Sequence, residues 1–135
     1  MPAALGQTKR LASFTTPAGQ DVFSLLKFEA REALSELFVY QVVTTCTTED
    51  FALESLVAEK CAIKMTLKDG KERIFNGVLV EAQWLGREND LDNYRFVLRP
   101  WLWLLSQRTD CRIFKNKTAI DIIKVIFGKE DKASF

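Results

Sequence analysis

The chain has 135 residues, of which 47% are hydrophobic, and its 19 basic and 18 acidic residues leave a net charge of +1. This length is enough for one domain with a hydrophobic core, and the balanced charge argues against a nucleic-acid-binding surface as its main purpose. No apolar run is long enough for stable membrane insertion, and residues 1–6 lack the apolar core of a secretory signal. We therefore expect a protein that is made and folded in the cytoplasm.

Residues 1–9 are weakly patterned and are predicted to be frayed. Alternating apolar residues predict a short strand over 10–16 and a returning strand over 22–28. Between them, residues 16–21 are rich in turn formers and are predicted to be a hairpin loop. The chain therefore starts as a β-structure.

The segment 29–36 has helix-favouring residues but lies between two strand patterns, so it is predicted to be a loop with one helical turn. A strong strand follows over 37–45. Asp50 is then positioned to cap a short apolar helix over 51–57.

The clearest strand pattern covers residues 61–67. The Asp69-Gly70 dipeptide after it predicts a type I′ hairpin turn. The partner strand covers 72–84 and is long, and Asn76-Gly77 is the place where a bulge or bend would let a small sheet curl.

Residues 86–93 form a charged segment before a strand over 94–99, so the strands on either side are predicted to be an antiparallel hairpin. The oxygen-bearing side chains of 88–93 could hold calcium, but the central Gly and the spaced bidentate Glu of an EF-hand are missing. A solvated hairpin loop is the better interpretation.

Two further groups of charged residues, one acidic and one basic, have ordinary explanations. The acidic group lies in the segment 29–36 and is interpreted as a charged loop without convergent partners. The basic group lies around the predicted turn at Asp69-Gly70, where it either contacts an anionic partner or blunts the edge of a sheet. The carboxylates are Glu29, Glu32 and Glu36, and the cations are Lys64, Lys68, Lys71 and Arg73.

The chain contains no histidine and three widely spaced cysteines, Cys46, Cys61 and Cys111. Without histidine there is no Ser-His or Cys-His nucleophile pair, and the absence of a C-x-x-C pair argues against zinc. We expect the cysteines to be small buried hydrophobic residues. No catalytic residue, metal or cofactor is predicted.

Pro100 cannot continue the strand before it, and residues 101–105 then hold two tryptophans and three leucines. A cluster this apolar either anchors a core or forms a surface made for a partner.

A helix is predicted over 119–127, with Thr118 as its N-cap, Asp121 at position N3 and Gly128 just after its end. This helix is apolar around most of its circumference and therefore needs burial on two sides.

Together these patterns predict a mainly β fold, a small antiparallel β-barrel of about six or seven strands with a C-terminal α-helix. The barrel is expected over 10–114, its helix over 115–128 and a truncated tail over 129–135.

Three segments, 28–38, 94–105 and 111–118, together with the Ile-rich helix that follows, are in their order and spacing similar to the N-terminal hub domain of VgrG proteins. VgrG is the spike protein of bacterial type VI secretion systems, and its superfamily includes the late-control D proteins of contractile-tail phages. The run Leu-Arg-Pro-Trp-Leu-Trp-Leu-Leu over 98–105 is the most specific part of the resemblance.

The resemblance implies a structural, non-enzymatic component of a puncturing spike: the N-terminal barrel of a trimeric hub that sits on the Hcp tube. Its partners would be the other copies of the hub, the Hcp tube and the remainder of the spike, and the apparatus would deliver it outside the cell. It also implies that the chain is an expressed fragment or a natural truncation of a longer protein.

On this basis the apolar cluster and the helix are expected to form the interface with the rest of the hub. The interface residues proposed are Trp101, Trp103, Leu104, Leu105, Ile122, Ile126 and Phe127. The alternative is a free-standing small barrel that binds a ligand or single-stranded nucleic acid.

Overall fold

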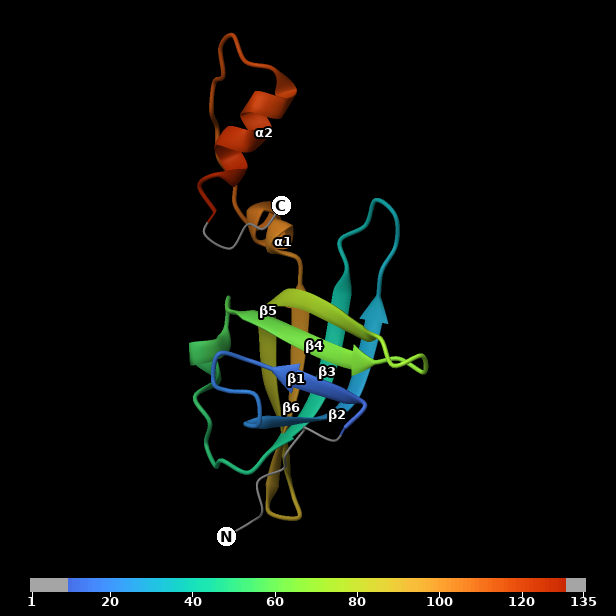
Figure 1. Ribbon diagram of the computed structural model, residues 1–135. Helices are drawn as coiled ribbons and strands as arrows, with labels where there is room; N and C mark the ends of the chain where they lie inside the picture. Colours follow the sequence, from blue (N-terminus) through green and yellow to red (C-terminus); the bar gives the residue numbers. More distant parts are fainter. Residues whose placement is uncertain (1–9, 131–135) are drawn as a thin grey trace. The chain divides into compact units, whose positions relative to one another are not determined.

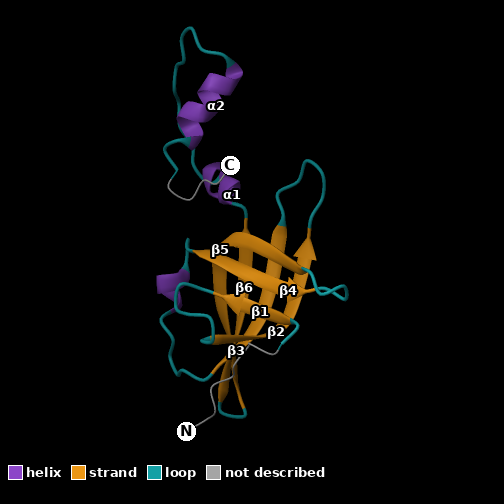
Figure 2. Ribbon diagram, viewed as in Figure 1, coloured by secondary structure: helices purple, strands orange, loops and turns teal. Residues whose placement is uncertain are grey.

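The computed structural model describes residues 10–130, so the predictions for residues 1–9 and 131–135 lie outside the described residues. The chain divides into two compact units, of which the first ends at Pro100 and the second begins at Trp101 (Figure 1). The first unit contains all six strands, and the second contains two α-helices (Figure 2).

The six strands form one antiparallel sheet in the order β1-β4-β5-β6-β3-β2. Edge strands β1 and β2 approach each other, so the sheet curls into a nearly closed barrel. The mainly β barrel with a C-terminal helix is therefore confirmed. The strands are β1 (Ala12–Thr15), β2 (Phe23–Arg31), β3 (Val39–Cys46), β4 (Lys60–Thr66), β5 (Glu72–Glu88) and β6 (Leu91–Arg99).

The first two strands were expected to pair with each other as a hairpin, and this prediction is wrong. The turn itself forms, because the Gly19 N–H donates to the Thr16 carbonyl over 3.0 Å. However, β1 pairs with β4 and β2 pairs with β3. The turn lies at the seam of the barrel, where Arg10 Nη1 also donates to the Leu25 carbonyl over 2.9 Å.

The β4–β5 hairpin is confirmed, but its turn type differs from the prediction. A type I′ turn needs positive φ at both central residues, and of Asp69 and Gly70 only Gly70 has it, at 79°. The Gly70 N–H donates to the Leu67 carbonyl over 2.9 Å, and the Leu67 N–H donates to the Lys71 carbonyl over 2.7 Å. The loop is therefore a three-residue connection whose last residue is the left-handed glycine.

The type I′ geometry occurs instead between β5 and β6. Asn89 and Asp90 have φ values of 50° and 60°, and the residues on either side of them, Glu88 and Leu91, are paired. The antiparallel hairpin expected here is confirmed, but most of the segment predicted as a charged loop belongs to its two strands.

Strand β5 is shared between two neighbours. Val78 faces Lys60 of β4 on one side and Arg99 of β6 on the other. The register shifts lie between Leu79 and Glu81 and between Trp84 and Gly86.

No register shift occurs at Gly77, where a bulge was expected. A Cβ at Gly77 would instead lie 2.9 Å from Leu98 Cβ, so this glycine permits a close approach of β5 and β6.

Two local helix predictions fail. The segment after Asp50 forms only a 3-10 turn, η1 (Leu53–Leu56), without a side-chain cap, and Asp50 itself has φ of 48°. In the segment 29–36, β2 continues to Arg31 and a turn follows, in which the Glu36 N–H donates to the Ala33 carbonyl over 3.4 Å. This turn is not helical, because Ser35 has φ of 61°. Pairing with β3 outweighs the local helix propensity there.

The barrel core is built from aromatic rings. Phe23 contacts Phe96 edge-on with ring centroids 5.0 Å apart, and Phe14 lies 5.5 Å from Phe96. Leu56 of η1 is also fully buried.

Cys46 and Cys61 are buried as expected, and burial raises the pKa of the Cys61 thiol to about 12. Cys111 is exposed, so the prediction is wrong for this residue, which lies in the loop between the two α-helices of the second unit.

The second unit contains α1 (Trp101–Ser106) and α2 (Ala119–Phe127). The predicted start of α2 is confirmed by a capping box: Thr118 Oγ1 accepts from the Asp121 N–H, and the Thr118 N–H donates to Asp121 Oδ2, each over 3.2 Å. The Thr118 hydrogen bonds lower the pKa of the Asp121 carboxyl. Gly128 follows the helix with right-handed backbone, φ −65°.

Candidate interaction surface

The seven residues expected at an interface all lie in the second unit, and each is half-buried there. Trp101 contacts Phe127 edge-on with ring centroids 4.8 Å apart, so α1 and α2 pack together at this point. Neither helix contains a buried residue. Apolar contact area of this unit therefore remains open to solvent.

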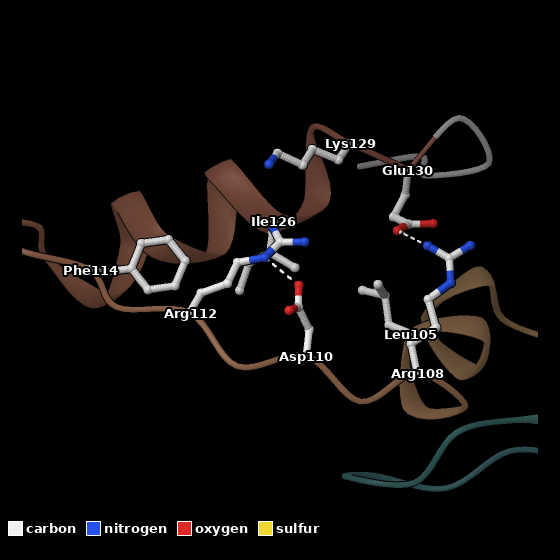
Figure 3. Close-up of a pocket in the computed structure, with 8 residues that line it drawn as sticks. All are labelled: Leu105, Arg108, Asp110, Arg112, Phe114, Ile126, Lys129 and Glu130. Carbon is white, nitrogen blue, oxygen red and sulfur yellow. Dashed lines mark hydrogen bonds and ion pairs between the residues drawn. The ribbon is translucent and has the colours of Figure 1, made fainter.

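A pocket of about 300 Å³ lies within the same unit. Two interface candidates, Leu105 and Ile126, line it together with Phe114 (Figure 3). Two ion pairs lie at its rim: Arg108 Nη1 is 2.6 Å from Glu130 Oε1, and Arg112 contacts Asp110. The lining therefore combines apolar side chains with two ion pairs and the Lys129 cation. The lining residues are Leu105, Arg108, Asp110, Arg112, Phe114, Ile126, Lys129 and Glu130.

Helix α2 was expected to be buried on two sides, and the described residues do not bury it in this way. Ile120 and Ile123 are 65% and 47% exposed, and Ile113 before the helix is 85% exposed. Large apolar side chains left exposed in one small unit are typical of a protein–protein contact.

A polar cluster on the barrel was not predicted from the sequence. The Tyr40 hydroxyl donates to Glu32 Oε1 over 2.5 Å, and Arg73 Nη2 lies 2.7 Å from Glu32 Oε2. The Arg73 guanidinium also lies 4.4 Å from the centroid of the Phe75 ring. Glu32 is therefore not an isolated loop carboxylate. Since Arg73 is 41 residues away, no local pattern could have revealed the pair.

This cluster changes the pH dependence expected of the barrel. Burial, followed by the hydrogen bond to Glu32, raises the pKa of Tyr40 well above its ordinary value near 10. The folded state therefore favours the neutral phenol. Its contribution to stability is complete below about pH 10 and is lost as the pH rises further.

We expect Tyr40→Phe to lower the free energy of unfolding by about 1.5–3 kcal/mol at pH 7, because a hydrogen bond to a charged group is lost. Above about pH 10 the difference between the two proteins should shrink. Urea unfolding between pH 7 and pH 11 measures this difference in the free energy of unfolding. The Cys61 thiol also has a raised pKa, but it is present in both proteins, so its contribution cancels. A difference that stays constant with pH would contradict the assignment.

The hairpin carboxylate Asp92 is buried, contrary to the solvated loop that was expected. Trp84 Nε1 donates to Asp92 Oδ1 over 3.1 Å, and Arg87 Nη1 lies 3.9 Å from Asp92 Oδ2. Each oxygen of this carboxylate thus has a protein partner. Within residues 10–130 no group of three metal-ligating side chains occurs.

The basic residues of the β4–β5 hairpin have partners of their own. Lys64 Nζ lies 2.6 Å from Glu72 Oε1, and Lys71 Nζ lies 3.2 Å from Asp69 Oδ2. With the Arg73–Glu32 pair, three of the four cations are paired with carboxylates of the barrel itself. The suggestion that they blunt the edge of a sheet is wrong, because β4 and β5 each have a paired strand on both sides. None of the described helices is long and apolar enough to cross a membrane.

A small antiparallel barrel followed by helices with exposed apolar side chains is typical of a domain that packs into a larger assembly. The phage tail baseplate hub (GPD) family matches residues 31–135. The chain belongs to this family.

Three type VI secretion system spike proteins of Pseudomonas aeruginosa are related to the chain. VgrG1b is 36% identical over 92% of the chain, VgrG1a 34% over 90% and VgrG1c 32% over 93%. The chain spans only 17–19% of the length of these relatives.

The barrel also resembles a solved structure. The E. coli c3393 protein, a type VI secretion component similar to the T4 bacteriophage tail proteins gp27 and gp5, matches with a TM-score of 0.75 and 26% identity. The match covers 90% of this chain and 33% of that one.

Proposed function

We propose that this chain acts as the barrel of a trimeric hub in a type VI secretion spike. The observation that carries the proposal is the 36% identity to the spike protein VgrG1b over 92% of the chain. The family match and the likeness to a phage-tail-like secretion component support it independently.

The proposed role is mechanical. The hub would join the spike to the Hcp tube, and contraction of the apparatus would drive both out of the cytoplasm. Such a role needs rigid packing and complementary surfaces, and it needs no catalytic group. The fully buried aromatic core of the barrel supports the first requirement.

The helices α1 and α2 are the surface that we assign to the remainder of the hub. Trp103, Leu104 and Ile122 are half-buried in the described unit and would become buried in the assembly. Burial of apolar area contributes about 25 cal/mol per Å². Apolar contact of this kind would stabilise the trimer more than the exposed ion pairs of the barrel.

The experiment is a replacement in VgrG1b, in which this chain substitutes for the matching region. We expect the chimaera to restore Hcp secretion in a strain that lacks VgrG. Trp103→Ala and Ile126→Asp should each reduce secretion roughly tenfold or more, since every 1.4 kcal/mol lost at an interface is a factor of ten.

Lys124→Asp is the matched control, because it changes charge on the exposed side of the same helix. This variant should keep secretion near the level of the unmodified chimaera. Full secretion by both interface variants would show that α1 and α2 are not the contact surface. Failure of the unmodified chimaera, when it is folded and produced, would count against the hub function itself.

A further inference from the structure

The hairpin formed by the end of β5 and the start of β6 carries an exposed aromatic residue. Trp84 is 57% exposed, and its neighbour Leu85 is 48% exposed. Figure 1 shows this hairpin extending past the other strands of the barrel. Two large, exposed apolar residues thus follow one another in this hairpin.

The indole of Trp84 is held in place. Its N–H donates to the buried carboxylate of Asp92, which is 6% exposed. Asp92 faces Arg87 across the hairpin, and Arg87 Nη2 lies 2.6 Å from Glu49 Oε1. Because the polar atom of the ring is satisfied inside the protein, the surface left to solvent is the apolar part of the ring.

Leu85 lies in a bulge. Trp84 pairs with Tyr94 and Gly86 pairs with Asn93, so Leu85 is the extra residue on its strand. Bulges re-aim a side chain away from the regular alternation. The hairpin is further ordered by the type I′ turn at Asn89 and Asp90. A rigid aromatic residue beside an aliphatic one loses little conformational entropy when a partner binds.

The surroundings of this apolar pair are acidic. The Arg87 guanidinium is a nearby cation, and its pKa is raised by the hydrogen bond with Glu49 and by the charges of Asp92 and Asp90. The charge of Asp50 acts on the neighbouring Tyr94. The carboxylates that contact or adjoin the hairpin end are Glu49, Asp50, Asp90 and Asp92, and the cations are Arg87 and Arg95, of which Arg95 faces Gln83 and lies 3.8 Å from Glu81.

This charge pattern selects the chemistry of a partner. Phosphate backbones and anionic lipid surfaces would be repelled by the carboxylates. A cation, in contrast, gains both from the carboxylates and from the face of the indole. Hot spots of protein interfaces are enriched in tryptophan surrounded by a polar rim.

We propose that Trp84 and Leu85 form a docking face for a protein segment that presents basic and apolar side chains together. The partner's arginine or lysine would lie over the indole and pair with the carboxylates of the 49–50 and 88–90 loops. Its apolar side chain would pack on Leu85. This contact uses no residue of α1 or α2 and does not depend on the hub assignment.

The test is titration of the 135-residue chain with synthetic ten-residue peptides, followed by NMR of the tryptophan indole N–H signals. The first peptide alternates Arg and Leu, the second alternates Arg and Ser, and the third alternates Glu and Leu. We expect the Arg/Leu peptide to shift the Trp84 signal, with a Kd about tenfold lower than that of the Arg/Ser peptide, a difference of about 1.4 kcal/mol. The Glu/Leu peptide should not bind.

Variants locate the contact. Trp84→Ala and Leu85→Ser should each raise the Kd about tenfold. Isothermal titration calorimetry measures the Kd of every variant, because Trp84→Ala lacks the Trp84 indole signal. Asp50→Asn combined with Asp90→Asn removes charge while keeping residues that tolerate positive φ, and it should weaken binding and reduce its salt dependence. Asp69→Asn, on the β4–β5 hairpin, is the control and should leave binding unchanged. Leu85→Ser keeps the Trp84–Asp92 hydrogen bond, so it tests the face even where Trp84→Ala disturbs folding.

Three results would overturn the proposal. Equal binding of the Arg/Ser and Arg/Leu peptides would show diffuse charge attraction without an apolar contact. Binding that survives both Trp84→Ala and Leu85→Ser would place the contact elsewhere. Competition by a single-stranded oligonucleotide for the same Trp84 shift would make the face a nucleic-acid site instead.

Discussion

Phe96→Ala is expected to lower the free energy of unfolding of the barrel by about 3–5 kcal/mol, the usual cost of truncating a buried aromatic ring. Phe96 lies at the centre of β6 and is fully buried. Its ring contacts Phe23 edge-on at 5.0 Å and Phe14 at 5.5 Å, counted between ring centroids. Strands on both sides hold β6, so the space left by the ring cannot close by a small movement of the backbone.

Urea unfolding followed by far-UV circular dichroism measures this loss. Leu34→Ala is the matched control, because Leu34 is 96% exposed, and its effect should stay within about 0.5 kcal/mol. A loss below about 1 kcal/mol for Phe96→Ala would mean that the ring is not packed as described.

Gly77→Ala is expected to destabilise the barrel by about 1–3 kcal/mol, the range for overpacking. Replacing glycine by alanine normally stabilises a chain by about 0.4–1 kcal/mol when space and backbone allow it. Gly77 has no positive φ, so backbone strain plays no part. The new Cβ would lie 2.9 Å from Leu98 Cβ and 3.3 Å from the Arg99 carbonyl oxygen, and both atoms belong to the fixed part of β6.

The double variant Gly77→Ala with Leu98→Ala tests this explanation. Alanine at position 98 keeps the Cβ, so it cannot relieve the close contact, and the two losses measured by urea unfolding should at least add. The loss in free energy of unfolding of the double variant could instead be smaller than the sum of the two single losses by about 1 kcal/mol or more. That result would place the clash at the end of the Leu98 side chain.

Local patterns were sufficient for much of the fold. Alternation predicted β4 and the pairing of β5 with β6, because one face of each strand is buried. The helix α2 was predicted with its N-cap, since the interaction of Thr118 with Asp121 spans only three residues. The short helix α1 was not predicted, because its apolar residues lack a clear period.

The candidate surface was predicted in part. The apolar residues of 101–105 and of α2 were identified from composition and periodicity, and the contact of Trp101 with Phe127 brings the two segments together. The docking role that we propose for Trp84 was not predicted from the sequence. Spacing in the chain indicates neither the bulge at Leu85 nor the hydrogen bond from Trp84 to Asp92.

By itself, the sequence determined the strand-rich barrel, the capped final helix and the resemblance to the hub family. Each of these depends on residues close together in the chain, where side-chain period and capping chemistry act directly. Only the tertiary structure decided that β1 and β2 meet at a seam, that Gly77 permits close packing against Leu98, and that Glu32 is held by Tyr40 and Arg73. The physical reason is that barrel closure brings together distant residues, and their contacts follow from strand order and register, which short-range pattern does not encode.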